Sequence, residues 1–233
     1  MKKLFTLAIF CANIGVFSQI KALTEDGKEV ILFENSTWRF VNESDSLTME
    51  TIGTNEGVFE KSKNSTFLLK SKRLDVGVYI NPKKWRVSNK ADSPYVEYVF
   101  SGTNIDNLTA GFLLTEKVQI SSLKNLKDLI LTNVQKNADY FRLKTSEYRT
   151  VNGLKVLYLR YIANVKGMDF EYAAQYYMDA EGYTGLAGFS PQKNFDTNSE
   201  QIQELLNGLW FTQKAEVSEK VQYSPPPPPM RWK

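Results

Sequence analysis

The chain has 233 residues, no histidine, one cysteine and a formal net charge of +3. A single cysteine excludes an intramolecular disulfide, and without histidine a zinc, copper or iron–sulfur site is not expected. The small net charge argues against nucleic acid as a partner. We also expect no cofactor, because the sequence carries none of the glycine-rich phosphate-binding motifs.

Residues 1–18 are typical of a secretory signal peptide. Two lysines precede a mostly apolar stretch, Leu4–Phe17, and the small Ser18 offers a cleavage point. We therefore expect an exported protein without a transmembrane anchor after leader removal. Retention of the leader as an anchor and lipid attachment at Cys11 stay open, although the stretch is shorter than the roughly 20 residues of a spanning helix.

Residues 19–42 predict a small β-hairpin. The runs Glu29–Glu34 and Thr37–Val41 alternate apolar and polar residues on either side of a turn-prone Asn35-Ser36. An isolated hairpin is only marginally stable in water. We therefore expect this hairpin to dock on the main domain or on a partner.

Residues 43–64 predict a polar linker, because they are rich in Ser, Thr, Asn, Glu and Gly and have no clear period. Within this segment, Asp45-Ser46-Leu47 resembles the O-glycosylation acceptor of Bacteroidetes. That resemblance makes Ser46 a candidate glycosylation site.

Residues 65–211 predict one α+β domain. Short strand patterns come first, and then a helix with Ser121 or Ser122 as its cap and apolar residues along one face. A second helix is expected near the end, where Thr197 and Glu200 have the spacing of a capping box and Ile202–Leu209 is periodically apolar.

Between these helices the sequence predicts an antiparallel four-stranded meander. Four strand-like runs cover residues 141–189, and they are joined at Asn152-Gly153, Lys166-Gly167 and Glu181-Gly182. Such pairs tolerate the positive φ of tight hairpin turns. The run Leu154–Val165 is apolar at both parities, which predicts a central strand covered on both faces.

This order of elements resembles the PsbP-like group of α/β/α sandwiches, which includes the DcrB-like lipoproteins. The resemblance covers about residues 67–209 and rests on Val76–Trp85, the Thr150–Gly153 hairpin and a terminal Leu-Leu-x-Gly-Leu run. It implies an antiparallel meander with two packed helices, and it brings no catalytic motif. Separately, Thr24–Leu32 with Thr37-Trp38 resembles a hairpin segment of exported Bacteroidetes proteins, which implies a Gram-negative periplasmic, outer-envelope or extracellular location.

Tyrosines crowd the predicted meander, and they suit either sheet packing or a binding surface. Strand alternation places Tyr177 on one face with Glu171 and Gln175. We take these three residues, with Tyr183, as the candidate binding face for a glycan, peptide or lipid.

The last segment, 212–233, predicts a proline-rich tail. Five consecutive prolines favour a polyproline II helix that could dock in an aromatic groove of a partner or act as a spacer. The candidate contacts are Pro225, Pro226, Pro227, Pro228, Pro229 and Trp232.

Taken together, the sequence favours a non-enzymatic binding or assembly module of the bacterial envelope, with a protein or small-ligand partner. Small-ligand binding on the aromatic sheet face is the alternative. A third possibility is a hydrolase that uses carboxylates only, for which Glu171 and Glu181 are the nearest pair.

Overall fold

The structure is a computed structural model, and it describes residues 20–25, 27, 29–32, 38–40, 49–104 and 108–215. The predicted signal peptide, the candidate glycosylation site Ser46 and residues 216–233 of the proline-rich tail lie outside these residues, whereas 212–215 lie against the domain, where the amide of Ala215 donates to the carbonyl of Ser71. Across the described ranges, no helix combines the length and the apolar character needed to cross a bilayer.

An eight-stranded sheet forms the centre of the molecule, in the order β4-β10-β11-β12-β13-β9-β8-β7. Neighbouring strands are antiparallel except for the short parallel pair β4–β10. The strands are β4 (Gly53–Thr54), β7 (Trp85–Ser88), β8 (Val96–Gly102), β9 (Ala110–Glu116), β10 (Tyr140–Val151), β11 (Leu154–Val165), β12 (Met168–Met178) and β13 (Tyr183–Pro191).

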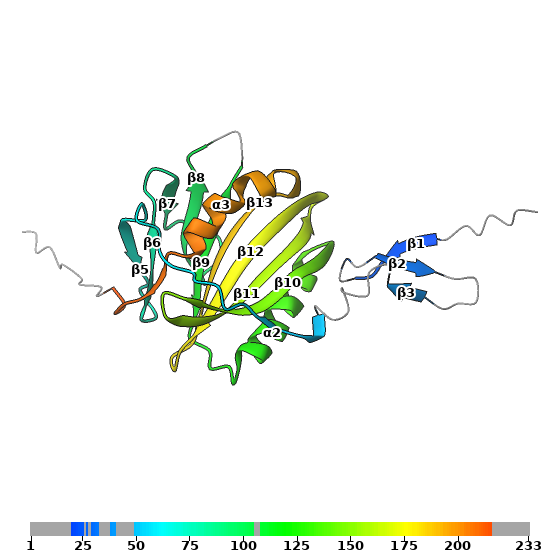
Figure 1. Ribbon diagram of the computed structural model, residues 1–233, viewed down its shortest axis with the longest axis horizontal. Coiled ribbons are helices and arrows are strands. Elements are labelled where there is room, and N and C mark those ends of the chain that lie inside the picture. Colours follow the sequence, from blue (N-terminus) through cyan, green and yellow to red (C-terminus); the bar gives the residue numbers. More distant parts are fainter. Residues whose placement is uncertain are drawn as a thin grey trace, which may run out of the picture.

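Two layers cover this sheet (Figure 1). The helix α2 (Leu123–Asn137) packs on one face, and α3 (Phe195–Leu206), which follows the 3₁₀ turn η2 (Gln192–Asn194), packs on the other. A second sheet of three strands shares the α3 side, in the order β14-β6-β5. Its strands are β5 (Phe67–Lys70), β6 (Val76–Ile80) and β14 (Leu209–Phe211). The predicted α+β class with two packed helices is confirmed.

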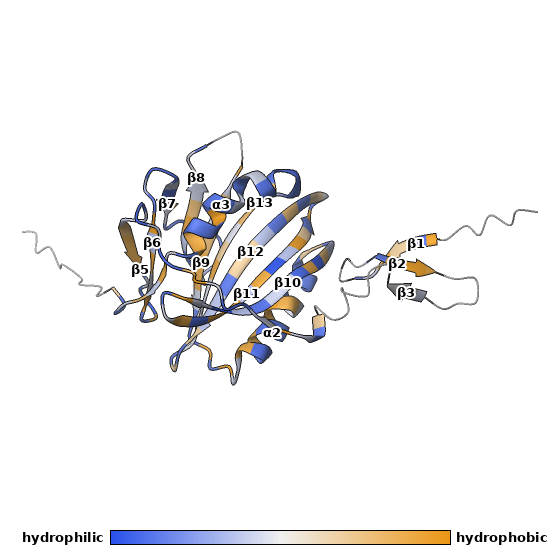
Figure 2. Ribbon diagram, viewed as in Figure 1, coloured by the Kyte–Doolittle hydropathy of each residue, from blue (hydrophilic) through white to orange (hydrophobic). Residues whose placement is uncertain are grey.

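The meander β10–β13 is confirmed, and its first two turns take the positive φ that the sequence predicted, whereas the turn at Glu181-Gly182 does not. At the β10–β11 turn Asn152 and Gly153 have φ values of 49° and 83°, and Lys166 and Gly167 repeat this at the next turn with 53° and 79°. Both pairs therefore take the backbone conformation that two-residue hairpins require. Apolar and polar residues alternate along β10 and β12 (Figure 2), as expected when successive side chains face different layers.

The central strand β11 is buried on both faces, as its sequence predicted. Val156 belongs to the core on the α3 side, and Leu157 and Leu159 belong to the core on the α2 side; all three are fully buried. The sheet thus separates two hydrophobic cores.

The predicted N-terminal hairpin is present and gains a strand. β2 (Glu29–Leu32) pairs with β3 (Trp38–Phe40), and β1 (Ile20–Leu23) adds to the other edge of β2. The turn after β1 lies against the main domain, where a β-carbon on Gly27 would collide with the backbone of Phe141.

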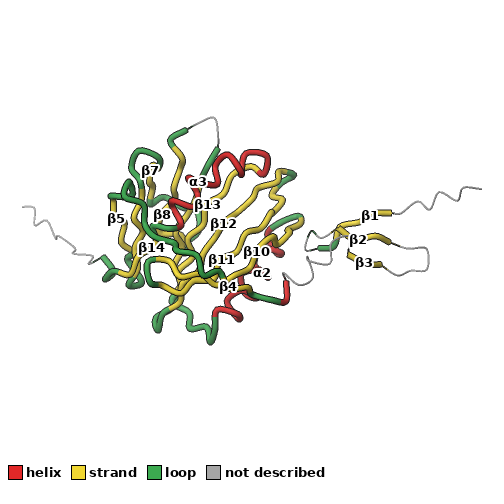
Figure 3. Tube along the Cα trace, viewed as in Figure 1, coloured by secondary structure: helices red, strands yellow, loops and turns green. Residues whose placement is uncertain are grey.

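The segment predicted as a polar linker differs in its second half, because residues 49–64 lie against the domain. β4 pairs with β10, and Phe59 forms a parallel bridge with Val151. The buried ammonium of Lys127 also donates to the carbonyls of Met49 and Thr51. Most of these contacts are made by backbone groups, which every residue carries. The polar composition of the segment therefore did not indicate that it packs on the domain. The loop from β4 to β5 then crosses the molecule (Figure 3).

The two helix starts had different outcomes. Ser122 caps α2 as predicted, since its hydroxyl accepts from the amide of Asn125 at 3.1 Å. The capping box at Thr197 and Glu200 was wrong. α3 begins earlier, at Phe195, after an Asn194 cap position whose side chain makes no capping bond. Phe195 is buried in the core, and this burial sets the start of the helix.

Candidate functional site

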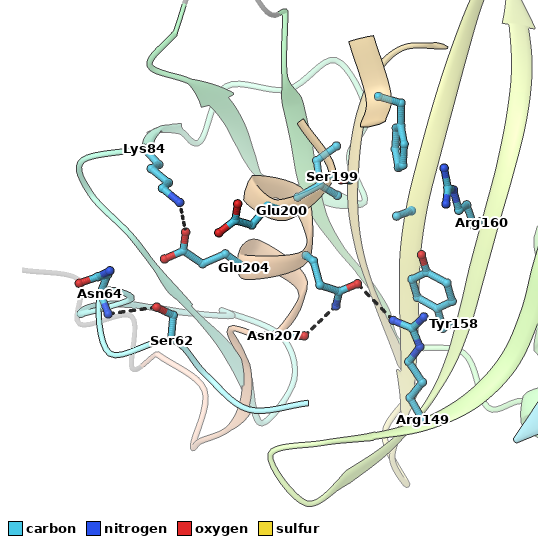
Figure 4. Close-up of a pocket in the computed structure, with 14 residues that line it drawn as sticks. Ser62, Asn64, Lys84, Arg149, Tyr158, Arg160, Ser199, Glu200, Glu204 and Asn207 are labelled. Atoms are coloured by element: carbon cyan, nitrogen blue, oxygen red, sulfur yellow. Dashed lines mark hydrogen bonds and ion pairs between the residues drawn. The ribbon is translucent and has the colours of Figure 1, made fainter. Parts of the chain in front are cut away.

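A groove of about 610 Å³ runs along α3 on the sheet face that this helix covers. Figure 4 shows Arg149, Tyr158 and Arg160 on the sheet side of the helix, and Lys84 with Glu204 on its other side. β10 and β11 supply the first set, and the loop before β5 closes the groove with Ser62 and Asn64. Four separate parts of the chain therefore meet here.

Arg149 is fixed between the sheet and the helix. Its Nε donates to Glu147 Oε1 at 2.6 Å, and its Nη1 donates to Gln203 Oε1 of α3 at 3.2 Å. The guanidinium carbon lies 3.3 Å from the centre of the Tyr158 ring and 4.4 Å from that of Phe59. A planar guanidinium can combine such stacking with hydrogen bonds. The side chain is thus held in place before any ligand arrives.

Arg160 is held in a similar way, by a buried carboxylate. Arg160 Nε and Lys144 Nζ both donate to Glu171 Oε1, the second at 2.9 Å. Glu171 is only 2% exposed, and the Arg160 guanidinium also stacks on Phe195 at 4.7 Å. Glu171 therefore forms ion pairs with two cations from neighbouring strands, which explains why a carboxylate is tolerated inside the fold.

The third cation of the groove is also paired. Lys84 Nζ lies 2.6 Å from Glu204 Oε2, and Asn81 donates to the other oxygen at 3.1 Å. Burial alone raises the pKa of Glu204, but these hydrogen bonds outweigh it and the pKa is lowered. The carboxylate stays charged at neutral pH, so the helix and the loop before β7 remain tied together.

Tyr158 lies at the floor of the groove between the two arginines. Burial raises the pKa of its hydroxyl, although the charges of Arg149 and Arg160 oppose that shift. The phenol is therefore neutral under ordinary conditions and can both donate and accept a hydrogen bond. Among the described residues, no cluster of three or more acidic, cysteine or histidine side chains could hold a metal ion.

The candidate binding face does not form one open surface. Glu171, Gln175 and Tyr177 do point to the α3 side, as alternation predicted, but Glu171 is buried by its ion pairs. Gln175 is fully buried and donates to the carbonyl of Leu206 beneath the helix. Tyr177 is half-buried against the α3-side core. Tyr183 belongs to the opposite, α2-side core, so grouping it with the other three is corrected.

The carboxylate pair Glu171 and Glu181 is separated. Glu171 lies near one end of β12, and Glu181 follows its other end, where it pairs with Lys214 at 3.1 Å. Seven residues of extended strand, 172–178, lie between them, which is a span of more than about 20 Å at ~3.3 Å per residue. Glycosidase carboxylates stand about 5–10 Å apart, so these two do not form such a pair.

Sequence reasoning missed the arginines of the groove. Glu147 and Arg149 are two apart on one strand, a spacing that places both on one face and offers a weak local signal. Their partner Gln203 is 54 residues away along the chain. No pattern within the strand could have indicated that contact.

Comparisons with known proteins give likenesses to solved structures only. No protein-family model matches the chain, and no curated protein matches it in sequence. Among solved structures, it is similar to cyanobacterial PsbP from Synechocystis, with 13% identity and a TM-score of 0.47 over 64% of this chain and 94% of that one. PsbP, the group that the sequence motifs resemble, is thus among the similar structures.

Two further solved structures are similar at the same level. A protein of unknown function from Pseudomonas aeruginosa has 9% identity and a TM-score of 0.41, over 61% of this chain and 95% of its own. A Bacteroides thetaiotaomicron protein has 10% identity and a TM-score of 0.45; the match covers 65% of this chain and half of that protein. These likenesses concern the fold alone and carry no argument about a ligand.

Proposed function

We propose that this protein is an exported, non-enzymatic binding module of a bacterial cell envelope, and that its groove holds a segment of a polypeptide partner. The observation that carries the proposal is the pairing of every cation in the groove. Lys84, Arg149 and Arg160 each contact a carboxylate already. An anionic ligand would have to compete with those carboxylates, so a free anion is a poor fit.

A polypeptide fits the remaining chemistry better. Its backbone presents alternating donors and acceptors, and the groove offers groups of both kinds from Asn64, Ser199 and Asn207. The Gln203 amide is already bonded at both ends, to Arg149 and Asn207, and serves to hold the groove in shape. The arginines are stacked and hydrogen-bonded in advance, so binding would cost little side-chain entropy. These features support recognition of a neutral, hydrogen-bonding chain.

The titratable groups of the groove also suit binding more than proton transfer. A general acid or base works best with a pKa near the operating pH. Here the pKa of Tyr158 is raised and that of Glu204 is lowered. Both shifts move the groups away from neutrality, which supports a non-enzymatic role.

Export rests on the N-terminal sequence alone. If residues 1–18 form a cleaved leader, protein recovered from the periplasm or the medium will begin at Gln19. Intact mass will show this directly, and recovery of the full-length chain from the cytoplasm would contradict it. The same mass spectrum tests the predicted glycosylation, because an unmodified mature mass would exclude a sugar at Ser46.

Photo-crosslinking tests the groove as a partner site. A photoreactive amino acid is placed at Glu200 and at Asn64, two exposed positions on different walls, and at exposed Asp92 outside the groove as a control. In cells that make the protein naturally, both groove positions should capture one polypeptide and the control should not. Equal capture at Asp92, or none at Glu200 and Asn64, would contradict the proposal.

The proline-rich tail is a second proposed contact with partners, and its residues 216–233 lie outside the described residues. Intact protein and a chain lacking Pro225–Lys233 should recover different partner sets in parallel pull-downs. Identical sets would remove the tail from the proposal. The alternative that the sequence left open, small-ligand binding at the Tyr177 face, concerns the α3 side of the sheet. The stacked tyrosine rings lie on the opposite, α2 side.

A further inference from the structure

A row of aromatic rings crosses the α2 face of the sheet. It comes from four neighbouring strands, β11, β12, β13 and β9, which contribute Tyr161, Tyr172, Phe189 and Phe112. Tyr161 and Tyr172 are 5.0 Å apart between ring centres and only 8° from parallel. Tyr172 and Phe189 are 4.9 Å apart and 25° from parallel.

These distances fix how the rings stand. They match the spacing of about 4.8 Å between adjacent strands. Rings lying flat on the sheet would clash at this separation, so the rings must be stacked face to face. Tyr172 therefore has one face covered by Tyr161 and the other by Phe189. The three stacked rings, Tyr161, Tyr172 and Phe189, therefore present their edges to the layer above, whereas Phe112 at the end of the row is tilted by 54° from Phe189 at 6.4 Å.

A hollow of about 310 Å³ lies between α2 and three rings of this row, those of Tyr161, Tyr172 and Phe112. Ile130, Val134 and Ala138 form its helical wall, and Asn133 and Asn137 are exposed at its rim. The volume is at the lower end of the roughly 300–1,000 Å³ of small-molecule sites. The hollow is thus large enough for a ligand and is apolar on both long sides.

Charge narrows the class of ligand further. Of the described residues that line the hollow, Glu116 alone is charged, and its carboxylate interacts with the hydroxyl of Tyr183. No lysine or arginine lines the walls. An anionic head group would therefore meet a carboxylate and no compensating cation, which disfavours a free fatty acid.

We propose that this hollow binds the hydrocarbon chain of a lipid with an uncharged head group, with the head at the Asn133 and Asn137 rim. A sugar stacks on ring faces, and the faces of Tyr172 are already occupied. A flexible hydrocarbon chain needs only apolar ring edges and aliphatic side chains, which the aromatic row and the helix supply. The site lies across the sheet from the α3 groove, so the proposal stands or falls independently of a polypeptide partner there.

Binding of monodecanoylglycerol below its micelle concentration, measured by calorimetry on the full mature chain, tests this proposal. Saturable binding is expected, with weaker binding of decanoate and none of a neutral oligosaccharide. Val134→Phe should fill the hollow and weaken binding at least tenfold. Gln135→Phe, at the next and exposed position of α2, should leave it unchanged. Absent binding, equal binding by both variants, or binding of the oligosaccharide in place of the lipid would overturn the proposal.

A second measurement uses only the wild-type protein, so it does not require that any substituted variant folds. Monodecanoylglycerol with a diazirine in its chain is irradiated with the wild-type protein, and the labelled peptides are identified by mass spectrometry. Label should concentrate in α2 and in β11–β12. Label concentrated along α3, or scattered over the surface, would contradict the site.

Discussion

The two faces of the central sheet differ in how they satisfy their side chains. On the α3 face, charged residues are paired and stacked, as Arg149 is with Glu147 and Tyr158. On the α2 face, rings such as Tyr161 and Tyr172 stack on each other beside aliphatic helix residues. Alternation along the same strands produces both, so adjacent residues belong to different chemical environments. One sheet can therefore offer a polar and an apolar site back to back.

The largest expected effects come from the two helices that cover these faces. Leu126→Ala in α2 and Leu205→Ala in α3 each remove a fully buried side chain and should lower the free energy of unfolding by about 2–5 kcal/mol. Chemical denaturation checks both. A loss well below this range for one variant would mean that its helix contributes little to the stability of the domain. The two hydrophobic cores would then differ in their importance for folding.

Arg149→Lys should have the next largest effect. Lysine cannot keep the bonds to Glu147 and Gln203 while stacking on Tyr158, so we expect a loss of about 1–3 kcal/mol in unfolding free energy. Arg86→Lys, at an exposed position on β7, is the matched control and should change stability very little. Equal effects of the two substitutions would show that the polar face does not depend on its arginine.

Alkaline pH should separate the two faces through a pair of adjacent tyrosines. Burial raises the pKa of Tyr176 far above 10, so the folded state keeps a proton that the unfolded chain releases above about pH 10. Unfolding then becomes more favourable as pH rises. Tyr176→Phe should flatten this decline in stability. Tyr177→Phe, on the α3 face and only half-buried, should flatten it less, and the reverse order in urea titrations at pH 9–11 would be inconsistent with the burial of Tyr176.

The smallest effect is expected outside both faces. Lys214 and Glu181 form an exposed ion pair, which is worth at most about 1 kcal/mol and less in salt. Glu181→Ala should therefore shift the denaturation midpoint only slightly, and 0.5 M salt should remove the difference. A larger loss would show that this surface ion pair has a structural role of its own, away from the two cores.

Short-range rules predicted the parts of the fold that depend on neighbours in sequence. The hairpin turn at Asn152-Gly153 and the cap at Ser122 follow from local backbone chemistry, and alternation placed Tyr177 on the face of Glu171. The face of Tyr183 was predicted wrongly, because a turn separates Tyr183 from β12 and the alternation does not continue through a turn.

The candidate site depended on contacts that the sequence does not display. Glu171 resembled an accessible acid, and its burial by Arg160 and Lys144 requires the pairing of three strands. Gln175 is covered by the end of α3, where its partner Leu206 lies 31 residues later in the chain. Sequence periodicity therefore predicts exposure for polar residues that are in fact buried by partners far away in the chain.

Hydrogen–deuterium exchange with the crosslinked partner, once purified, tests the central claim most directly. Exchange is measured on the protein alone and with the partner bound. If the groove is the partner site, protection will increase in 60–65, in the paired ends of β10 and β11, and in α3, while α2 stays unchanged. Protection confined to α2, or no change along α3, would contradict it.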